Sequence, residues 1–117
     1  MHTSILKKGD QILVTKVRIA KTFFERFSGL MGQKQITIED VLVFPKCNSV
    51  HTFFMRISID VIFVSAQGVV TQVFSNLNPW RLLLPQKKAA HCIEMPSDEA
   101  SKMGISIGDS LSCEGVF

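Results

Sequence analysis

The sequence predicts a mostly β fold, a compact barrel-like or sandwich arrangement with two short helices. Short apolar runs rich in valine and isoleucine recur along the chain, and such runs are typical of buried strands. Turn-forming pairs such as Gln67-Gly68 separate these runs at short intervals. A chain of 117 residues, 46% apolar and 20% charged, has the size and composition of one globular domain. We therefore expect residues 1–117 to form a single domain.

The first part of the chain is predicted to contain a strand, a helix and a second short strand. Gln11–Ile19 has the β-branched composition of a strand. Residues 22–25 (Thr-Phe-Phe-Glu) have the spacing of a capping box, and the apolar residues after them recur at helical spacing. That pattern predicts a short amphipathic helix ending at Gly32. Residues 41–44 are apolar and stop at Pro45, which predicts a short buried strand.

The rest of the chain is predicted to be strands, one loop and a second helix. The strands are predicted over residues 47–56, 59–65, 69–74 and 89–95, with a last strand that runs through Cys113. Residues 76–81 are predicted to form a loop because Asn-Pro favours turns. Ser97 is predicted to cap a single-turn helix that ends at Gly104, with Asp98 and Glu99 at its positive end. Residues 53–55 (Phe-Phe-Met) are predicted to lie in the core.

Charge and cysteine content narrow the classes of function. The formal net charge is only +3, and Lys7-Lys8 and Lys87-Lys88 are the only adjacent basic pairs. A nucleic-acid-binding stripe requires clustered basic residues, so nucleic acid is not an expected partner. The three cysteines, Cys47, Cys92 and Cys113, are too few and too widely spaced for a disulfide framework and are predicted to be free thiols.

No apolar run has the length needed to span a membrane. Residues 1–10 contain too few strongly apolar residues for the core of a signal peptide. The sequence as written therefore predicts a cytoplasmic protein, unless a leader has been removed.

Four separated motifs occur in a fixed order along the chain. They are Arg26–Gly32 (Arg-Phe-Ser-Gly-Leu-Met-Gly), Leu42–Phe44, Ile59–Phe63 with Gly68–Val70, and Ile93-Glu94 followed by Gly104–Asp109. The ordered set, over roughly residues 11 to 113, resembles the domain-of-unknown-function family numbered 192. This resemblance implies a small, mostly β domain of about this length. The family has no established biochemical activity, and its members are often predicted to be secreted.

The chain differs from the common pattern of that family at two places. Many members have Trp-Met where this chain has His51-Thr52. In this respect the chain is similar to a subgroup that has the pattern His-Thr-x-x-Met-Arg and a later Pro-Trp-Arg, which is residues 79–81 here. A glycine is usual shortly after the family's glutamate, but Asp98-Glu99 occupies that region here. The resemblance therefore supports the fold and transfers no mechanism.

Asp60 is the most informative charged residue because it lies inside the apolar run of residues 59–64. A carboxylate enclosed by apolar side chains either takes up a proton or recruits a cation. The candidate cations are Arg56 and Arg26. We expect one of them to form a structural ion pair with Asp60. The alternative is a site in which an arginine remains free for an anionic ligand.

These residues lead to a favoured function and its alternatives. The favoured function is a noncatalytic ligand-binding or accessory module with a polar pocket in an apolar surround. The predicted pocket residues are Arg26, His51, Arg56, Asp60, Trp80 and Arg81. Arg26 or Arg56 would bind a small polar or anionic ligand, His51 would form one hydrogen bond with it, and Trp80 would cover it. Alternatively, Trp80 is exposed and the loop from Asn76 to Leu84 binds a protein partner.

A third class is a Cys/His metal or redox protein. Cys47 and His51 would lie about 13 Å apart on one face of a regular strand, at about 3.3 Å per residue, so they cannot share an ion directly unless the chain bends sharply. A tertiary metal site that joins His51 to Cys92 or Cys47 stays open, as does a thiolate–imidazole nucleophile. The sequence assigns no catalytic residue, metal ligand or cofactor, and it leaves open whether the protein is an enzyme.

Overall fold

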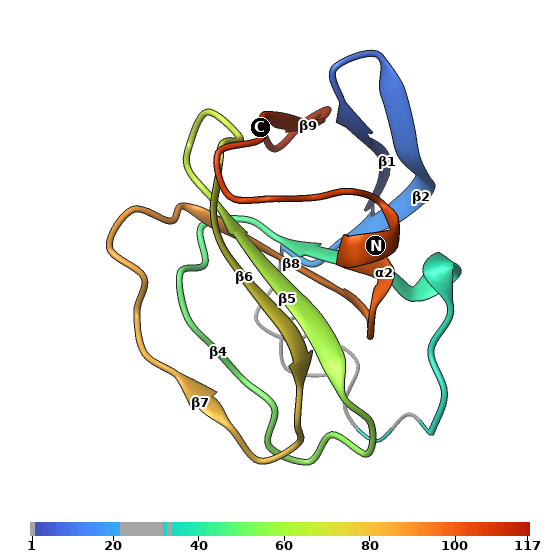
Figure 1. Ribbon diagram of the computed structural model, residues 1–117, viewed down its shortest axis with the longest axis vertical. Coiled ribbons are helices and arrows are strands. Elements are labelled where there is room, and N and C mark those ends of the chain that lie inside the picture. Colours follow the sequence, from blue (N-terminus) through green and yellow to red (C-terminus); the bar gives the residue numbers. More distant parts are fainter. Residues whose placement is uncertain (1, 22–31, 33) are drawn as a thin grey trace.

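The computed structural model describes residues 2–21, 32 and 34–117, which fold mostly into β-strands (Figure 1). Seven strands form one sheet in the order β6-β5-β8-β3-β2-β1-β9. Their bounds are β1 (His2–Lys8), β2 (Gln11–Ile19), β3 (Leu42–Phe44), β5 (Ile59–Val64), β6 (Val70–Leu77), β8 (His91–Pro96) and β9 (Leu111–Cys113). A separate two-stranded ribbon consists of β4 (Val50–His51) and β7 (Leu82–Leu83).

The helical content of the described residues is small. It comprises the α-helix α2 (Glu99–Lys102) and the 3-10 turn η1 (Ile38–Asp40). The helix predicted to end at Gly32 falls on residues 22–31, outside the described part of the chain. None of the helices in the described ranges combines the length and the apolar character that a membrane crossing requires.

The mostly β, compact fold is confirmed, but the barrel-like form is not, because the sheet is not closed into a barrel. The segments that lead into the edge strands β6 and β9 meet at an isolated bridge between Val69 and Ser110, next to backbone hydrogen bonds such as that from the amide of Leu111 to the carbonyl of Gly68. The sequence analysis also missed β1, which has few strongly apolar residues. This strand is held by antiparallel pairing with β2 on one side and with β9 on the other.

The predicted strand over residues 47–56 is shorter than expected, since only Val50 and His51 are extended and paired. The chain turns directly afterwards, where the amide of Met55 donates to the carbonyl of Thr52 at 3.2 Å. Phe54 occupies the third position of this turn with a φ of 64°. The hairpin predicted at Gln67-Gly68 is confirmed: Gly68 has a φ of 87°, and a Cβ at this position would collide with the carbonyl of Leu111.

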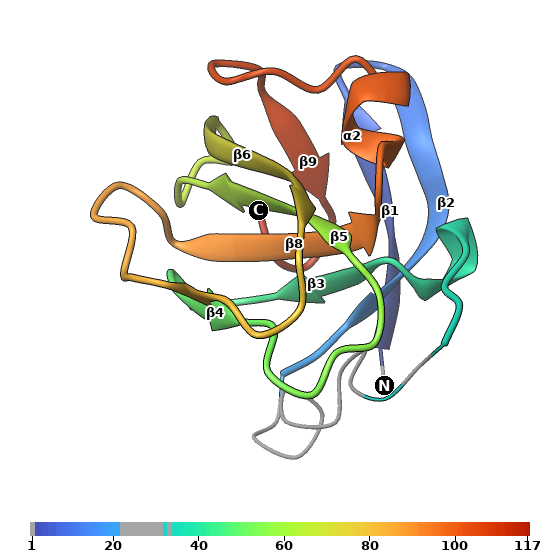
Figure 2. The same ribbon diagram turned by 60° about the horizontal axis from the view of Figure 1, so that its bottom comes forward.

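The central strands β5 and β8 are covered on both faces. Every residue of β5 is buried, and alternate residues belong to two different apolar clusters. One cluster includes Ala100 of α2, and the other packs against Val50 and Leu83 of the ribbon. Helix α2 and the β4–β7 ribbon therefore lie on opposite sides of the sheet, as Figures 1 and 2 both show. This arrangement separates the surroundings of Asp60 from those of Trp80.

Candidate functional site

The carboxylate of Asp60 is fully buried, at 0% exposure, and is bound by backbone amides. Its Oδ1 accepts from the amide of Asn76 at 2.9 Å and from that of Asp98 at 3.2 Å. Its Oδ2 accepts from the amide of Ala100 at 3.0 Å. Two of these amides belong to the first turn of α2, where backbone N–H groups have no intrahelical partner. Asp60 thus caps the helix from the neighbouring strand.

This geometry corrects two predictions. Arg56 is exposed, and no ion pair among the described residues joins it to Asp60, while Arg26 lies outside those residues. Backbone amides therefore bind Asp60 where an ion pair with Arg56 was predicted, and the alternative pair with Arg26 stays a prediction. Ser97 is not the helix cap: the N-cap is Asp98, whose own side chain does not cap. The Ser97 hydroxyl is buried and has no hydrogen-bond partner among the described residues.

Asp98 explains the departure from the family pattern after Glu94. Its backbone is left-handed, with a φ of 71°. Glycine adopts this conformation without steric cost, whereas aspartate is one of the few other residues that tolerate it. The Asp98 carboxylate also accepts a hydrogen bond from the amide side chain of Asn76 at 2.9 Å. Asp98 therefore adopts a backbone conformation that is typical of glycine.

On the opposite side, four aromatic rings form a continuous contact, which we call the aromatic face: His51, Phe53, Phe54 and Trp80. His51 stacks on Phe53 at a centroid distance of 4.9 Å, and Phe53 stacks on Trp80 at 5.9 Å. Phe54 packs against Trp80 at 4.9 Å with a tilt of 60°. Phe54 is 60% exposed and Trp80 is 61% exposed. The prediction that Phe54 lies in the core is therefore wrong, although Met55 beside it is buried.

Two exposed rings of the aromatic face, Phe54 and Trp80, are held by strained backbone. Phe54 and Trp80 both have a φ of 64°. A bulky side chain in the left-handed region is an outlier that costs on the order of 1–3 kcal/mol. Such strain persists only where the surrounding structure fixes the backbone, and it is concentrated at functional sites. The strain therefore marks Phe54 and Trp80 as candidate functional residues.

Thr52 fixes this backbone, and its side chain is fully buried. Its hydroxyl donates to the carbonyl of Asn78 at 2.7 Å and accepts from the amide of Arg81 at 2.8 Å. Its own amide donates to the carbonyl of Arg81 at 2.8 Å, and its carbonyl accepts from the amide of Trp80 at 2.9 Å. A single threonine thus holds the loop that carries Trp80 against the turn that carries Phe54. The His-Thr motif has a structural explanation in these bonds.

We predict that Thr52→Val lowers the free energy of unfolding by about 2–3 kcal/mol, because it leaves the Asn78 carbonyl and the Arg81 amide without their hydroxyl partner. Urea denaturation measures this loss, and the emission of Trp80 should shift as its loop loosens. Thr52→Ser, which keeps the hydroxyl, should retain most of the stability. Thr15→Val is the control on an exposed strand position. Equal stability of the Thr52→Val and Thr15→Val variants would contradict the role of the hydroxyl.

The structure brings together only some of the predicted site residues. His51 and Trp80 belong to the aromatic face, and the exposed residues Arg56 and Arg81 follow Phe54 and Trp80 in the chain. Asp60 is enclosed on the other side of the sheet. Phe53, Phe54 and Thr52 were missed because their apolar or neutral side chains within an apparent strand carry no signal of exposure or of a turn.

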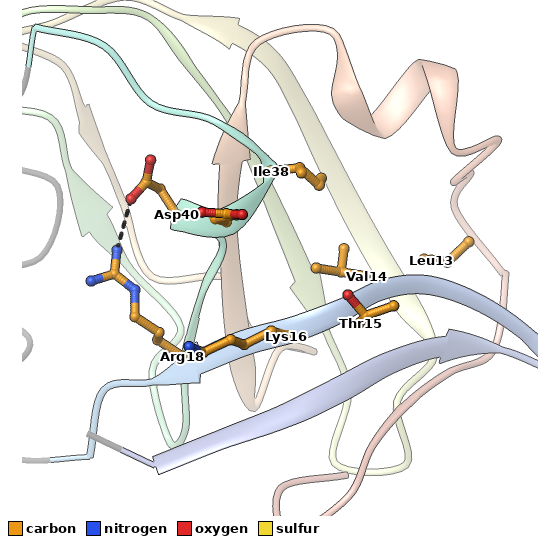
Figure 3. Close-up of a pocket in the computed structure, with 8 residues that line it drawn as sticks. Leu13, Val14, Thr15, Lys16, Arg18, Ile38 and Asp40 are labelled. Atoms are coloured by element: carbon orange, nitrogen blue, oxygen red, sulfur yellow. Dashed lines mark hydrogen bonds and ion pairs between the residues drawn. The ribbon is translucent and has the colours of Figure 1, made fainter.

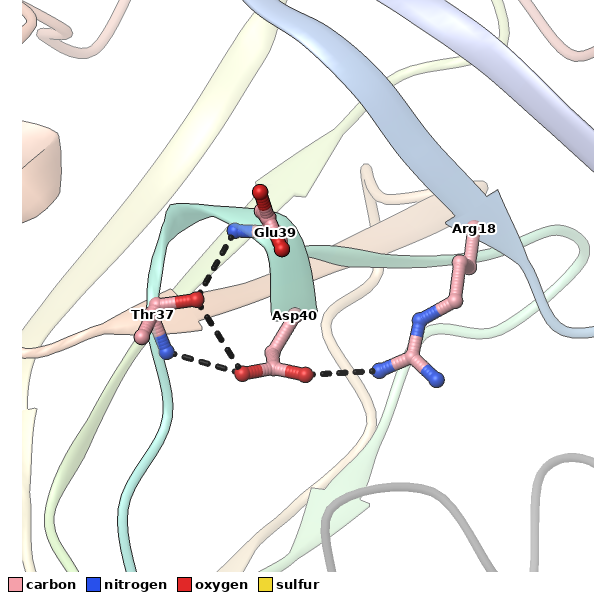
Figure 4. A network of polar contacts seen from close by, with 4 residues as sticks. All are labelled: Arg18, Thr37, Glu39 and Asp40. Atoms are coloured by element: carbon pink, nitrogen blue, oxygen red, sulfur yellow. Dashed lines mark hydrogen bonds and ion pairs between the residues drawn. The ribbon is translucent and has the colours of Figure 1, made fainter.

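A separate hollow of about 560 Å³ lies between β2 and η1 (Figure 3). Three of its lining residues, Arg18, Glu39 and Asp40, take part with Thr37 in one network of polar contacts (Figure 4). Arg18 Nη2 donates to Asp40 Oδ1 at 3.3 Å, and Asp40 Oδ2 accepts from the amide of Thr37 at 2.8 Å. The Thr37 hydroxyl in turn accepts from the amide of Glu39 at 3.2 Å. This network ties η1 to β2, while Arg18 Nε is buried and finds no hydrogen-bond partner in the part of the chain that the structure describes.

Glu94 is the second buried carboxylate of the sheet, at 7% exposure. Burial raises its pKa to about 7. Burial also raises the pKa of the Cys92 thiol, and the charges of Glu94 and Cys47 add to this effect. Sequence reasoning missed Glu94 as an electrostatic site, although it has the signal that singled out Asp60, a carboxylate within an apolar run.

The cysteines and histidines are dispersed. The three thiols are free, with Cys92 and Cys113 buried. The Cys47 thiol donates to the carbonyl of Ser49 at 3.0 Å. His91 accepts at Nδ1 from the amide of Lys46 at 3.1 Å, and burial lowers its pKa. Within the described ranges, no three side chains from His, Cys, Asp and Glu gather closely enough to hold a metal ion.

Two solved structures have this fold. A protein of unknown function from Novosphingobium aromaticivorans superposes with a TM-score of 0.78 at 22% identity, over 94% of this chain and 83% of that one. A protein from Sinorhizobium meliloti 1021 superposes with a TM-score of 0.79 at 17% identity, over 97% and 93%. At such identities the likeness concerns the fold alone.

Sequence relatives extend the comparison. A UPF0127 protein of Thermococcus sibiricus is 35% identical over 94% of this chain and 73% of its own length. A UPF0127 protein of Pyrococcus furiosus is 36% identical over 89% and 90%. The family model DUF192, described as Uncharacterized ACR, COG1430, matches residues 4–113. The chain therefore belongs to the DUF192 family of UPF0127 proteins, as its sequence motifs predict.

Proposed function

We propose that this protein is a noncatalytic binding module that recognises a partner through the aromatic face. The observation that carries the proposal is the conformation of Phe54 and Trp80, two rings that are more than half exposed and yet held by left-handed backbone. A chain that needed these residues only for stability could bury the rings or place glycine at the same φ. Exposed apolar side chains on a fixed scaffold are typical of interaction surfaces.

The surroundings of the aromatic face support recognition at a surface. Leu82 is 60% exposed and is the cross-strand partner of His51, and Leu84 is 70% exposed. These leucines extend the apolar surface along the β4–β7 ribbon. Asp60, the acidic member of the predicted pocket, already accepts hydrogen bonds from three backbone amides. These contacts favour the Trp80 loop as a partner surface over a pocket centred on Asp60.

A peptide-display selection with a randomised dodecapeptide library tests this proposal. We expect the enriched peptides to bind the wild-type protein and to lose at least about tenfold in affinity for Phe54→Gly, since truncation of a central aromatic anchor typically costs 2 kcal/mol or more. Glycine fits the φ of 64° at this position, so this variant should remain folded. Ile107→Ala, which truncates another exposed apolar residue (62%), should bind like the wild type. Failure to enrich peptides, or equal binding by Phe54→Gly, would contradict the proposal.

A further inference from the structure

We infer that the partner of the aromatic face is an acidic stretch of polypeptide, an inference that rests on the function proposed above. Between Val41 and Ile93 the sequence contains one carboxylate, Asp60, and that side chain is fully buried. The same stretch contains five exposed basic residues: Lys46, Arg56, Arg81, Lys87 and Lys88. The stretch that supplies the aromatic face thus presents positive charge and no exposed negative charge.

The basic residues are arranged at both ends of the β4–β7 ribbon. Arg56 and Arg81 follow the two strained aromatic residues at one end. At the other end, Lys87 and Lys88 lie in the turn that leads to β8. A hydrogen bond of 2.8 Å from the amide of Gln86 to the carbonyl of Asn48 joins this turn to the residues just before β4. The ribbon runs along one flank of the molecule between these ends (Figure 1). An extended acidic segment laid along the ribbon would meet positive charge at each end and apolar side chains between.

The rings and leucines favour polypeptide over nucleic acid. Phe53 and Phe54 already pack against Trp80, at 5.9 and 4.9 Å, so part of the indole is covered and less of it is open to a stacked base. Leu82 is 60% exposed and Leu84 is 70% exposed. Aliphatic side chains such as these pack against other aliphatic or aromatic side chains and do not stack on bases. Five cations, of which only Lys87 and Lys88 are adjacent, also give a weaker electrostatic footprint than the clustered stripe of a nucleic-acid-binding protein.

Four defined probes test the inference. Three are fluorescein-labelled, capped dodecapeptides with leucine and phenylalanine at the same alternate positions and with glutamate, glutamine or lysine at all others. The fourth is a labelled dodecathymidylate. At 50 mM NaCl we expect the glutamate peptide to bind about tenfold more tightly than the glutamine peptide, because several exposed ion pairs each contribute a few-fold. This advantage should shrink at 0.5 M NaCl, where screening is stronger.

Charge variants localise the effect. A double variant, Arg56→Ala with Arg81→Ala, should lose affinity for the glutamate peptide by several-fold and leave the glutamine peptide unchanged. Lys16→Ala, which removes an exposed cation from β2, is the matched control and should have no effect. The Phe54→Gly variant should weaken the binding of both peptides.

The outcomes separate the inference from the proposed function. Equal binding of the glutamate and glutamine peptides, lost in Phe54→Gly, would overturn the acidic partner and leave the aromatic face as the binding surface. If dodecathymidylate bound more tightly than the glutamate peptide and this binding depended on Phe54, the acidic-polypeptide partner would be overturned in favour of nucleic acid. If none of the probes bound, or if all of them bound equally well to Phe54→Gly, both the acidic partner and the proposed binding function of the aromatic face would be overturned.

Discussion

Replacing Asp60 by alanine is expected to lower the free energy of unfolding by about 3–5 kcal/mol. The substitution removes the only acceptor for the amides of Asn76, Asp98 and Ala100 that the described contacts show, and a buried amide left without an acceptor costs about 1–3 kcal/mol. Two of these amides begin α2, so the helix should loosen before the sheet does. Domains of this size have about 5–15 kcal/mol of total stability, and the variant lies near the limit of folding.

Asp60→Asn keeps the shape of the side chain and makes the prediction measurable if the alanine variant does not fold. Its single carbonyl oxygen can replace Oδ1, but its amide group faces the Ala100 amide, donor against donor. We expect an intermediate loss in urea denaturation, with faster hydrogen exchange at the Ala100 amide. Asp10→Ala, at an exposed turn, should change stability by less than about 0.5 kcal/mol.

Arg56→Ala distinguishes the backbone cap from the ion pair that the sequence predicts. Arg56 is exposed, so its truncation should cost less than about 0.5 kcal/mol. A loss as large as that of Asp60→Ala, with no additional loss in the double variant, would show that the guanidinium and the carboxylate act together. That result would contradict the cap seen in the structure.

The main strands could be predicted because their apolar runs are buried on one or both faces. Residues 59–64 are the clearest case, since all are buried and a turn at Gly68, with a φ of 87°, follows them. The ribbon could not be predicted in the same way. Thr52 ends β4 by bonding to the loop at residues 78–81, a contact between segments far apart in sequence that no local pattern encodes. Propensity favours a strand at Phe53-Phe54, and these tertiary bonds override it.

The candidate site could be predicted only in part, for a related reason. The sequence singles out His51, Trp80 and Asp60, and two of these lie on the aromatic face. It could not show that backbone amides satisfy Asp60, because every residue carries an amide and the pattern identifies only side-chain partners. It also could not show that Phe54 is exposed, since exposure follows from a φ that the sequence does not encode for phenylalanine.

Glu94 should make the stability of the protein fall as the pH rises from 5 to 8. Burial raises its pKa from 4.5 to about 7 in the folded protein. Between these two values the folded state binds more protons than the unfolded state, so the contribution of Glu94 to stability is full below pH 4.5 and is lost as the pH passes 7. A shift of this size corresponds to about 3 kcal/mol across the interval. None of the ion pairs among the described residues offsets this cost.

Two other groups set the limits of the measurement. Burial lowers the pKa of His91, so its contribution has the opposite sign and is lost as the pH falls below about 6.5. Burial raises the pKa of Cys92, whose thiol titrates in the unfolded chain near pH 8.5. When the free energy of unfolding of the wild type is subtracted from that of a Glu94 variant at the same pH, the contributions of His91 and Cys92 cancel to first order. The interval from pH 5 to pH 8 avoids most of the thiol titration.

Glu94→Gln should therefore equal the wild type in stability at pH 5 and exceed it by about 3 kcal/mol at pH 8. Glutamine has the shape of the protonated acid and cannot ionise, so the variant should lose the decline of stability with pH. Glu39→Gln, at an exposed position of η1, is the matched control and should keep the wild-type dependence. Urea denaturation at half-unit steps of pH measures all three proteins. A difference between Glu94→Gln and the wild type that stays constant from pH 5 to pH 8 would show that Glu94 ionises as freely in the folded protein as in the unfolded chain, and the carboxylate would then have to be stabilised by a partner.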